Sequence, residues 1–264
     1  MEHIEIVKEQ LRAYEKNLSY ALVTIINTDG GTTRTQGKMI VYENETAFGT
    51  VGGGAIERLV IRDAAEAIRT GKGGIKSYDM NTQASHVGLA CGGAMEVLVE
   101  IYGNRPTLVM CGAGHVGVAV MALARTLGFR IILLDNRQED FLADKLQLAD
   151  RFVPVKDYET AVKELDVTEG AYYVIAGPNH DCDGSSLAGA LTKCGAYVGM
   201  IGGPMKIKAI FTRLKDKGFT QAELDSVYTP IGLDVSNETP EEIAVAIMAE
   251  ILMVKNGKER PANL

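Results

Sequence analysis

The chain lacks any long hydrophobic segment. No run approaches the roughly 18 apolar residues that a membrane-spanning helix needs. The first residues, Met-Glu-His-Ile-Glu, are acidic and lack the apolar stretch of a signal peptide. We therefore expect a cytoplasmic protein that has no membrane partner.

The chain also lacks an excess of positive charge and a metal-binding cysteine pattern. It has 27 Lys and Arg against 34 Asp and Glu, a net charge of −7, which argues against nucleic acid as a partner. None of the four cysteines forms a Cys-x-x-Cys pair, so neither a zinc site nor a redox dithiol is indicated. Thiols in the cytosol are expected to stay reduced.

What remains is an ordinary globular composition in two halves of different pattern. The 264 residues are 46% hydrophobic and 23% charged, enough for one large or two ordinary domains. Residues 103–106, Gly-Asn-Arg-Pro, are the best linker. We predict a small N-terminal α/β domain over residues 1–104 and a C-terminal domain over residues 105–264.

The N-terminal half mixes helices with short strands. Residues 2–17 predict an amphipathic helix with Ile4, Val7, Leu11 and Tyr14 on one face. Further strands are expected at 20–26, 37–42, 46–51, 75–80 and 94–102, with a turn at 29–31 and a helix that ends near residue 70.

The C-terminal half alternates apolar runs with helix-length segments. The runs lie at 108–111, 131–134, 152–155, 172–176 and 196–201. This alternation predicts βαβ units and a doubly wound, Rossmann-like parallel sheet. Thr239, Pro240 and Glu242 indicate the capped start of the last helix.

A glycine turn follows the first of these strands, with the sequence Gly112-Ala113-Gly114-His115-Val116-Gly117. Gly112 permits a tight turn, Gly114 lets a phosphate approach the backbone, and Gly117 lets the helix pack on the strand. Free N–H groups and the helix dipole then favour an anion. The alternative is a sheet whose nucleotide site is vestigial. His115 either faces the ligand or merely fills space.

Asp135 ends the next strand at the spacing expected for a carboxylate that binds ribose hydroxyls. Such a carboxylate would also repel a 2′-phosphate, although Arg137 could offset that charge.

Two more loops follow strands of the predicted sheet. Residues 179–184, Asn-His-Asp-Cys-Asp-Gly, place His180 and Asp181 as candidates for proton transfer or metal binding. The alternative is that these side chains cap the next helix. Gly202 and Gly203 form a second glycine turn.

The N-terminal half has its own glycine turn, Gly52-Gly53-Gly54, before a helix with Glu57 in its first turn. Three such glycines are typical of an anion nest, whereas Glu57 alone can complement the helix dipole. Cys91 lies among glycines, unlike a packing cysteine, although free cysteines are usually buried and inert. Cys111 and Cys194 are expected in or beside core elements.

Five motifs in this order carry a resemblance: residues 52–57, Gly-Gly-Gly-Ala-Ile-Glu; residues 90–93, Ala-Cys-Gly-Gly; the turn 112–117 with Asp135-Asn136-Arg137; residues 230–234, Pro-Ile-Gly-Leu-Asp; and residues 239–244, Thr-Pro-Glu-Glu-Ile-Ala. Together they resemble the XdhC/CoxI family of xanthine dehydrogenase maturation factors over nearly the whole chain.

The resemblance implies a chaperone rather than a catalyst. Family members bind molybdenum cofactor (molybdopterin), protect it while its sulfido ligand is installed, and insert it into an apo molybdenum hydroxylase of the xanthine dehydrogenase type. A cysteine desulfurase is a further implied partner, and we expect a homodimer. The cofactor-binding residues would be Gly52, Gly53, Gly54, Glu57, Cys91, Gly92, Gly93, Gly112, Gly114, His115, Gly117, Asp135, Arg137, Gly202 and Gly203.

The same resemblance makes Cys91 the residue that would contact molybdenum, which is soft enough to bind a thiolate. The sequence departs from the family at Ala55, where many members have a second cysteine. It also has Gly203-Pro204-Met205 where many members have cationic residues, which leaves Lys206 as the only cation there.

Two other functions stay open on the residues alone. The first is an NAD-dependent oxidoreductase that uses Asp135 and His180, with NAD(P) or another nucleotide as cofactor. The second is a nucleotide-sensing regulatory protein with a Rossmann domain, which would not need the Gly52–Gly54 turn or Cys91.

Overall fold

The computed structural model describes residues 2–30, 34–79, 93–103, 105–137, 139–167, 169–235 and 238–258. The chain divides into two compact units, unit 1 at Met1–Asn104 and unit 2 at Arg105–Leu264. Each unit has its own hydrophobic core. No helix in these ranges is both long enough and apolar enough to cross a membrane.

Unit 1 contains an antiparallel sheet in the order β3-β2-β1-β5-β4. The strands are β1 (Tyr20–Gly30), β2 (Lys38–Tyr42), β3 (Ala47–Thr50), β4 (Gly74–Asp79) and β5 (Gly93–Tyr102). β1 is longer than the sequence predicts, because Asp29 and Gly30 pair with Ala94 and Gly93 instead of turning.

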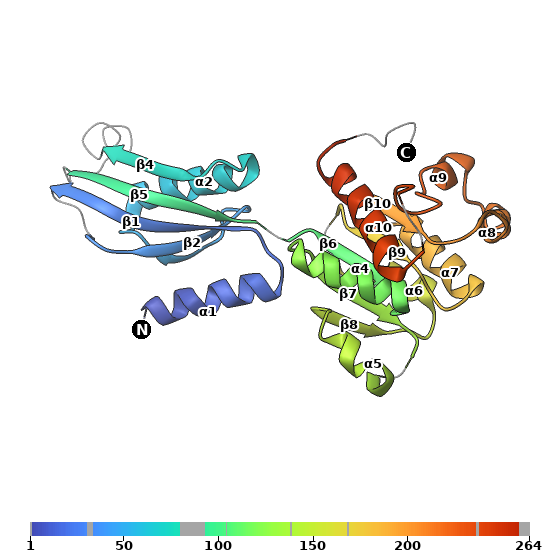
Figure 1. Cartoon of the computed structure of the whole chain (residues 1–264). Helices are drawn as coiled ribbons and strands as arrows, with labels where there is room; N and C mark the ends of the chain where they lie inside the picture. Colours follow the sequence, from blue (N-terminus) through green and yellow to red (C-terminus); the bar gives the residue numbers. More distant parts are fainter. Residues whose placement is uncertain are drawn as a thin grey trace. The chain divides into compact units, whose positions relative to one another are not determined.

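Two helices, α1 (Glu2–Glu15) and α2 (Gly54–Thr70), lie on opposite faces of this sheet (Figure 1). Successive side chains of a strand point to opposite faces. Ala21 and Val23 accordingly pack with α2, whereas Tyr20 and Leu22 pack in the cluster that contains Ile6 of α1.

The orientation of α1 differs from what its apolar pattern predicts. The residues Ile4, Val7, Leu11 and Tyr14 are each more than half exposed. The helix instead buries a face with Ile6, Glu9 and Ala13. Glu9 is accommodated because the Tyr42 hydroxyl donates to it over 2.7 Å and Arg12 pairs with it at 3.2 Å.

Unit 2 is a parallel sheet in the order β10-β9-β6-β7-β8, which confirms the predicted Rossmann-like class. Its strands are β6 (Thr107–Cys111), β7 (Arg130–Asp135), β8 (Arg151–Pro154), β9 (Tyr172–Ile175) and β10 (Tyr197–Met200). Its helices are α4 (His115–Thr126), α5 (Glu139–Leu146), α6 (Tyr158–Lys163), α7 (His180–Leu191), α8 (Pro204–Asp216), α9 (Gln221–Asp225) and α10 (Pro240–Lys255).

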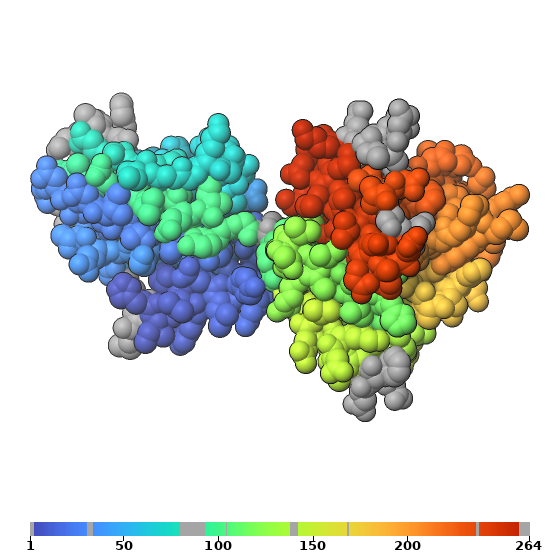
Figure 2. All heavy atoms as spheres, in the orientation of Figure 1, coloured from blue at the N-terminus to red at the C-terminus, as the bar shows by residue number. Residues whose placement is uncertain are grey.

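Helices cover both faces of this sheet. Side chains of α6, α7 and α8 pack on the face that holds Val109 and Cys111, and those of α4 and α10 pack on the face that holds Leu108 and Met110. Figure 2 shows α10 (red) and α4 (green) side by side on the outer surface of unit 2.

The strand order sets the place of a ligand site. From β6 the chain runs to β7 and β8 on one side, and then crosses to β9 and β10 on the other. The order therefore reverses between β6 and β9. Ligands of open α/β sheets bind at such a switch point, outside the carboxyl ends of the strands.

Candidate functional site

The glycine turn between β6 and α4 is shaped by two glycines that cannot be replaced. Gly112 has φ +105°, and a Cβ there would collide with the carbonyl group of Ala176 in the loop after β9. A Cβ at Gly117 would collide with the carbonyl oxygen of Gly112. These contacts hold the turn against the switch point and hold α4 against the turn.

Gly114 has a different role, because nothing lies within 4 Å of the position its Cβ would take. Its φ of −70° is open to any residue, so neither strain nor packing requires glycine there. The missing side chain instead leaves space in front of the first turn of α4. The approach of a phosphate to the backbone at Gly114 stays a prediction.

Among the described residues, no side chain caps the N-terminus of α4. The first N–H groups of a helix lack intrahelical partners. Gly114 caps α4 without a side-chain hydrogen bond, and the first turn of α4 contains no acidic residue. By contrast, the Asn179 side chain caps α7, and Thr239 caps α10 in the predicted capping box. The α4 terminus can therefore accept an external anion.

Asp135 lies beside this turn but is completely buried. One carboxylate oxygen accepts from the Ala113 N–H at 2.7 Å and from Arg137 Nη2 at 2.6 Å. The other accepts from the Arg137 N–H at 2.9 Å and from Arg137 Nε at 2.8 Å. Burial would raise the pKa of Asp135, but these hydrogen bonds outweigh it and lower the pKa. The carboxylate therefore holds the turn together.

The loop after β9 shows the capping arrangement that the sequence left open. The Asn179 side chain accepts from the N–H groups of Asp181 and Cys182. His180 is exposed, and Asp181 pairs with Arg213 of α8 at 2.6 Å. Within the described part of the chain, no group of three His, Cys, Asp or Glu side chains could hold a metal ion.

Sequence reasoning missed a buried ion pair between α7 and α8. Asp183 is fully buried, accepts from the Gly177 N–H at 2.6 Å and pairs with Lys206. Lys206 also donates to the carbonyl oxygen of Ile201 at 3.0 Å. The lysine that the family resemblance left as a cation for the ligand is therefore occupied in the protein. The sequence signal for this ion pair was Asp183, the second aspartate of the loop, because capping of the helix does not require it.

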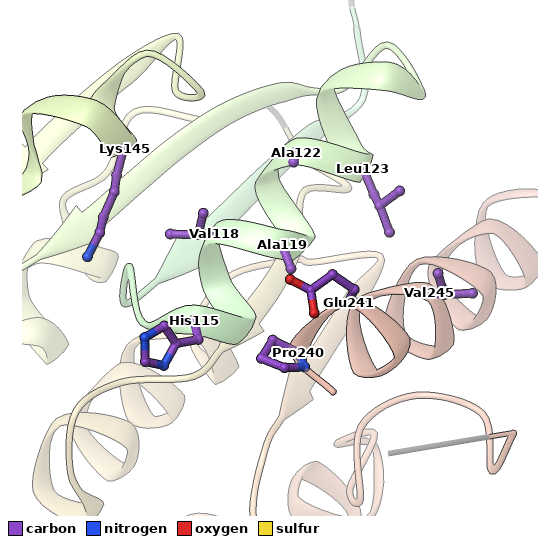
Figure 3. A pocket seen from close by; sticks show the side chains of 9 residues that line it. All are labelled: His115, Val118, Ala119, Ala122, Leu123, Lys145, Pro240, Glu241 and Val245. Atoms are coloured by element: carbon purple, nitrogen blue, oxygen red, sulfur yellow. The ribbon is translucent and has the colours of Figure 1, made fainter. Parts of the chain in front are cut away.

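His115 lines a trough on the outer side of α4, and its side chain is exposed. The trough has a volume of about 530 Å³. Figure 3 shows His115 beside Pro240, at the N-terminal ends of α4 and α10, and Lys145 on the other side of α4. His115 therefore does not fill space in the core. The other lining residues are Val118, Ala119, Ala122, Leu123, Glu241 and Val245.

In the glycine turn at residues 52–54, the carboxylate of Glu57 occupies the position that an anion would take. Gly52, Gly53 and Gly54 all have positive φ, as a nest requires. Glu57 accepts from the N–H groups of Val51 and Gly53 at 3.0 Å each, and from the Thr50 hydroxyl. An external anion would have to compete with Glu57.

The cysteines differ in environment. Cys91 and Gly92 lie outside the described residues, and Gly93 begins β5. Burial raises the pKa of Cys111 to about 12, so this thiol stays protonated. Burial also raises the pKa of Cys182. Cys194 is exposed, so it lies outside the core itself, although it stands directly before the buried strand β10. It follows β9 and α7 in a surface turn.

Comparisons with known proteins agree with this architecture. Residues 108–251 match the XdhC Rossmann domain, and residues 13–79 match the XdhC and CoxI family. A crystal structure described as a xanthine dehydrogenase from Bacillus halodurans superposes with a TM-score of 0.51 at 17% identity. It covers 100% of this chain and 98% of that one, and at this identity it supports the fold alone.

Two curated relatives extend well beyond this chain. Uncharacterized protein YqeB of Escherichia coli (strain K12) is 32% identical over 96% of this chain and 47% of its own length. A Bacillus subtilis (strain 168) protein named as a probable subunit of xanthine dehydrogenase is 26% identical over 57% of this chain and 43% of its own. The chain thus spans a little under half the length of these relatives. The matches confirm the family that the five motifs indicated, and the chain belongs to the XdhC and CoxI family.

Proposed function

We propose that this protein is a maturation factor that binds molybdenum cofactor, protects it during sulfuration and delivers it to an apo molybdenum hydroxylase of the xanthine dehydrogenase type. The cofactor is cargo in this proposal, and the protein need not catalyse a reaction. A cysteine desulfurase would supply the sulfur while the cofactor is bound.

The observation that carries the proposal is the unfilled N-terminus of α4 behind Gly114. Molybdopterin carries a phosphate, and α4 begins with N–H groups that no side chain of the described chain caps. The space at Gly114 admits a phosphate to these N–H groups. Family membership and the name of the Bacillus subtilis relative support a connection with xanthine dehydrogenase.

The structure gives less support to hydride transfer by Asp135 and His180. Asp135 is buried and accepts four hydrogen bonds, so it is not placed to bind a substrate. His180 lies in an exposed first turn of α7. For these reasons, the cofactor-delivery function is the one that the geometry supports best.

Cys91 is the proposed contact to molybdenum. We expect Cys91→Ser to keep the fold but to lower retention of the cofactor, because a hydroxyl is a poorer ligand than a thiolate for a soft metal. Cys194→Ser is the matched control, since Cys194 is an exposed thiol in unit 2. Equal retention by both variants would remove Cys91 from the proposal.

Native mass spectrometry tests the function directly. The protein would be isolated without oxygen from a host that makes molybdenum cofactor. We expect a bound mass equal to that of the cofactor, and its loss in Gly114→Asp. A bound mass equal to NAD, or no bound mass under these conditions, would contradict the proposal.

A further inference from the structure

The acceptor capacity of Asp135 is already filled. A carboxylate offers about four lone-pair sites for hydrogen bonds. In this structure Asp135 accepts from four donors: the Ala113 N–H and three nitrogens of Arg137. Its side chain has no exposed surface.

This arrangement differs from what dinucleotide-binding domains require. In those domains an acidic residue about 20 residues beyond the glycine turn accepts hydrogen bonds from the ribose hydroxyls. Asp135 has that position in the sequence and at the end of β7. To bind ribose, however, it would have to leave the Ala113 N–H and the Arg137 guanidinium. Leaving them would also disturb the turn that holds the phosphate.

We propose that the site at the N-terminus of α4 binds a phosphate monoester without forming hydrogen bonds to the two hydroxyls of a ribose. Arg137 sets this specificity, because it holds Asp135 in the turn. The inference rests on the proposed function, because both use the same glycine turn. Asp135 is then a positioning residue for the turn, and Arg137 determines which ligands the site prefers.

The charges support this role for Arg137. The side-chain hydrogen bond to Asp135 raises the pKa of Arg137, and hydrogen bonds to Asp135 lower the pKa of that carboxyl. Both groups are therefore charged at neutral pH. The pair has no net charge, so Asp135 does not repel a phosphate at the neighbouring helix terminus.

Two nucleotides that differ only in the 2′ and 3′ hydroxyls of the ribose, its diol, test the inference. Calorimetry on the full chain would compare adenosine 5′-monophosphate with its 2′,3′-dideoxy analogue. We expect equal affinities for the wild-type protein, within about twofold. A preference of tenfold or more for the diol would overturn the inference and leave the phosphate site intact. If neither nucleotide binds, the inference is overturned, because it predicts binding of both monoesters, whereas the proposed function is decided separately by the bound mass in native mass spectrometry.

Arg137→Leu tests the residue that sets the specificity. Freed from Arg137, Asp135 can accept from ribose, and we expect about a tenfold preference for the diol, as hydrogen bonds to a charged group provide. Arg125→Leu removes an exposed arginine from α4 and controls for the change in net charge. Equal affinities in a folded Arg137→Leu would show that Arg137 does not set the specificity. If that variant does not fold, Arg137→Gln takes its place with the same expected preference, because glutamine cannot neutralise Asp135.

Discussion

Two glycine turns in this protein each have a carboxylate that binds their N–H groups. Glu57 accepts from Val51 and Gly53 in unit 1, and Asp135 accepts from Ala113 in unit 2. The two turns nevertheless differ. Glu57 occupies the nest at the start of α2, whereas Asp135 lies to the side of the turn and leaves the first turn of α4 without an acid.

Glu57→Gln is expected to destabilise unit 1 by about 1 kcal/mol near neutral pH, because a neutral amide accepts these hydrogen bonds less strongly than a carboxylate. Burial would raise the pKa of Glu57, but hydrogen bonds from Thr50 and the turn lower it overall. The stabilisation by Glu57 is therefore present above its unfolded pKa, about 4.5, and is lost as the pH falls through the lower folded value.

Urea unfolding of both proteins between pH 3 and pH 7 measures this effect. The difference between wild type and variant should shrink as the pH falls below about 4.5. A difference that stays constant over this range would show that the Glu57 charge does not stabilise the turn.

Glycines at the α4 turn could be assigned from the sequence, but the role of the carboxylates could not. Backbone conformation follows from glycine spacing, so the tight turn at Gly112 and the close packing at Gly117 were predictable. The hydrogen bonds of Asp135 depend on side-chain orientation and on Arg137, which curls back onto it. Sequence spacing does not determine either of these.

At the scale of elements, α1 shows the limit of a periodicity argument. Its apolar stripe and its buried face are two different sides of the same helix. The burial of Glu9 could not be predicted from the apolar pattern of the helix, because its hydrogen-bond partner, Tyr42, comes from β2. Most strands were predictable, since apolar runs bounded by glycine or charge set their positions. The end of β1 was not, because pairing with β5 decided it.

Ile6→Ala and Leu11→Ser separate the two faces of α1. Ile6 is 3% exposed, so its truncation should destabilise unit 1 by about 2–4 kcal/mol. Leu11 is 56% exposed, and its substitution should change stability by less than about 0.5 kcal/mol. Thermal unfolding measures both. A loss of stability well above this limit for Leu11→Ser would mean that the exposed apolar face of α1 is packed against protein in solution.

The motif at residues 230–234 is connected to α10 and β10 through a buried glutamate. Glu250 accepts from the Tyr197 hydroxyl at 2.6 Å and from the Gly232 N–H at 2.9 Å. A Cβ at Gly232 would also crowd the backbone of α10 at Ala246. This family motif therefore has a structural explanation in the packing of unit 2.

Tyr197→Phe is expected to destabilise unit 2 by about 1–3 kcal/mol, because it removes a donor from the buried Glu250. Tyr228→Phe is the control, since Tyr228 stacks on Tyr197 at 4.5 Å between ring centroids and phenylalanine keeps that contact. Denaturant unfolding that gave equal losses for the two variants would contradict a special role for the Tyr197 hydroxyl.

At the scale of the whole molecule, a homodimer remains our prediction. The sheet of unit 1 has β3 and β4 at its edges, and exposed edges favour association. Symmetric dimers are also the commonest assembly. Sedimentation velocity at micromolar concentration should give twice the chain mass of 28.4 kDa. A single species at 28.4 kDa would refute the prediction.

Anaerobic transfer of molybdenum cofactor to an apo-hydroxylase tests the central claim most directly. Gly114→Asp should abolish transfer without unfolding the protein, because aspartate is a good N-cap residue and its carboxylate would fill the phosphate site. Gly103→Asp is the matched control, since Gly103 is also an open glycine but lies outside the turn. We predict loss of hydroxylase activation with Gly114→Asp and retention with Gly103→Asp. Full activation by Gly114→Asp would contradict the account.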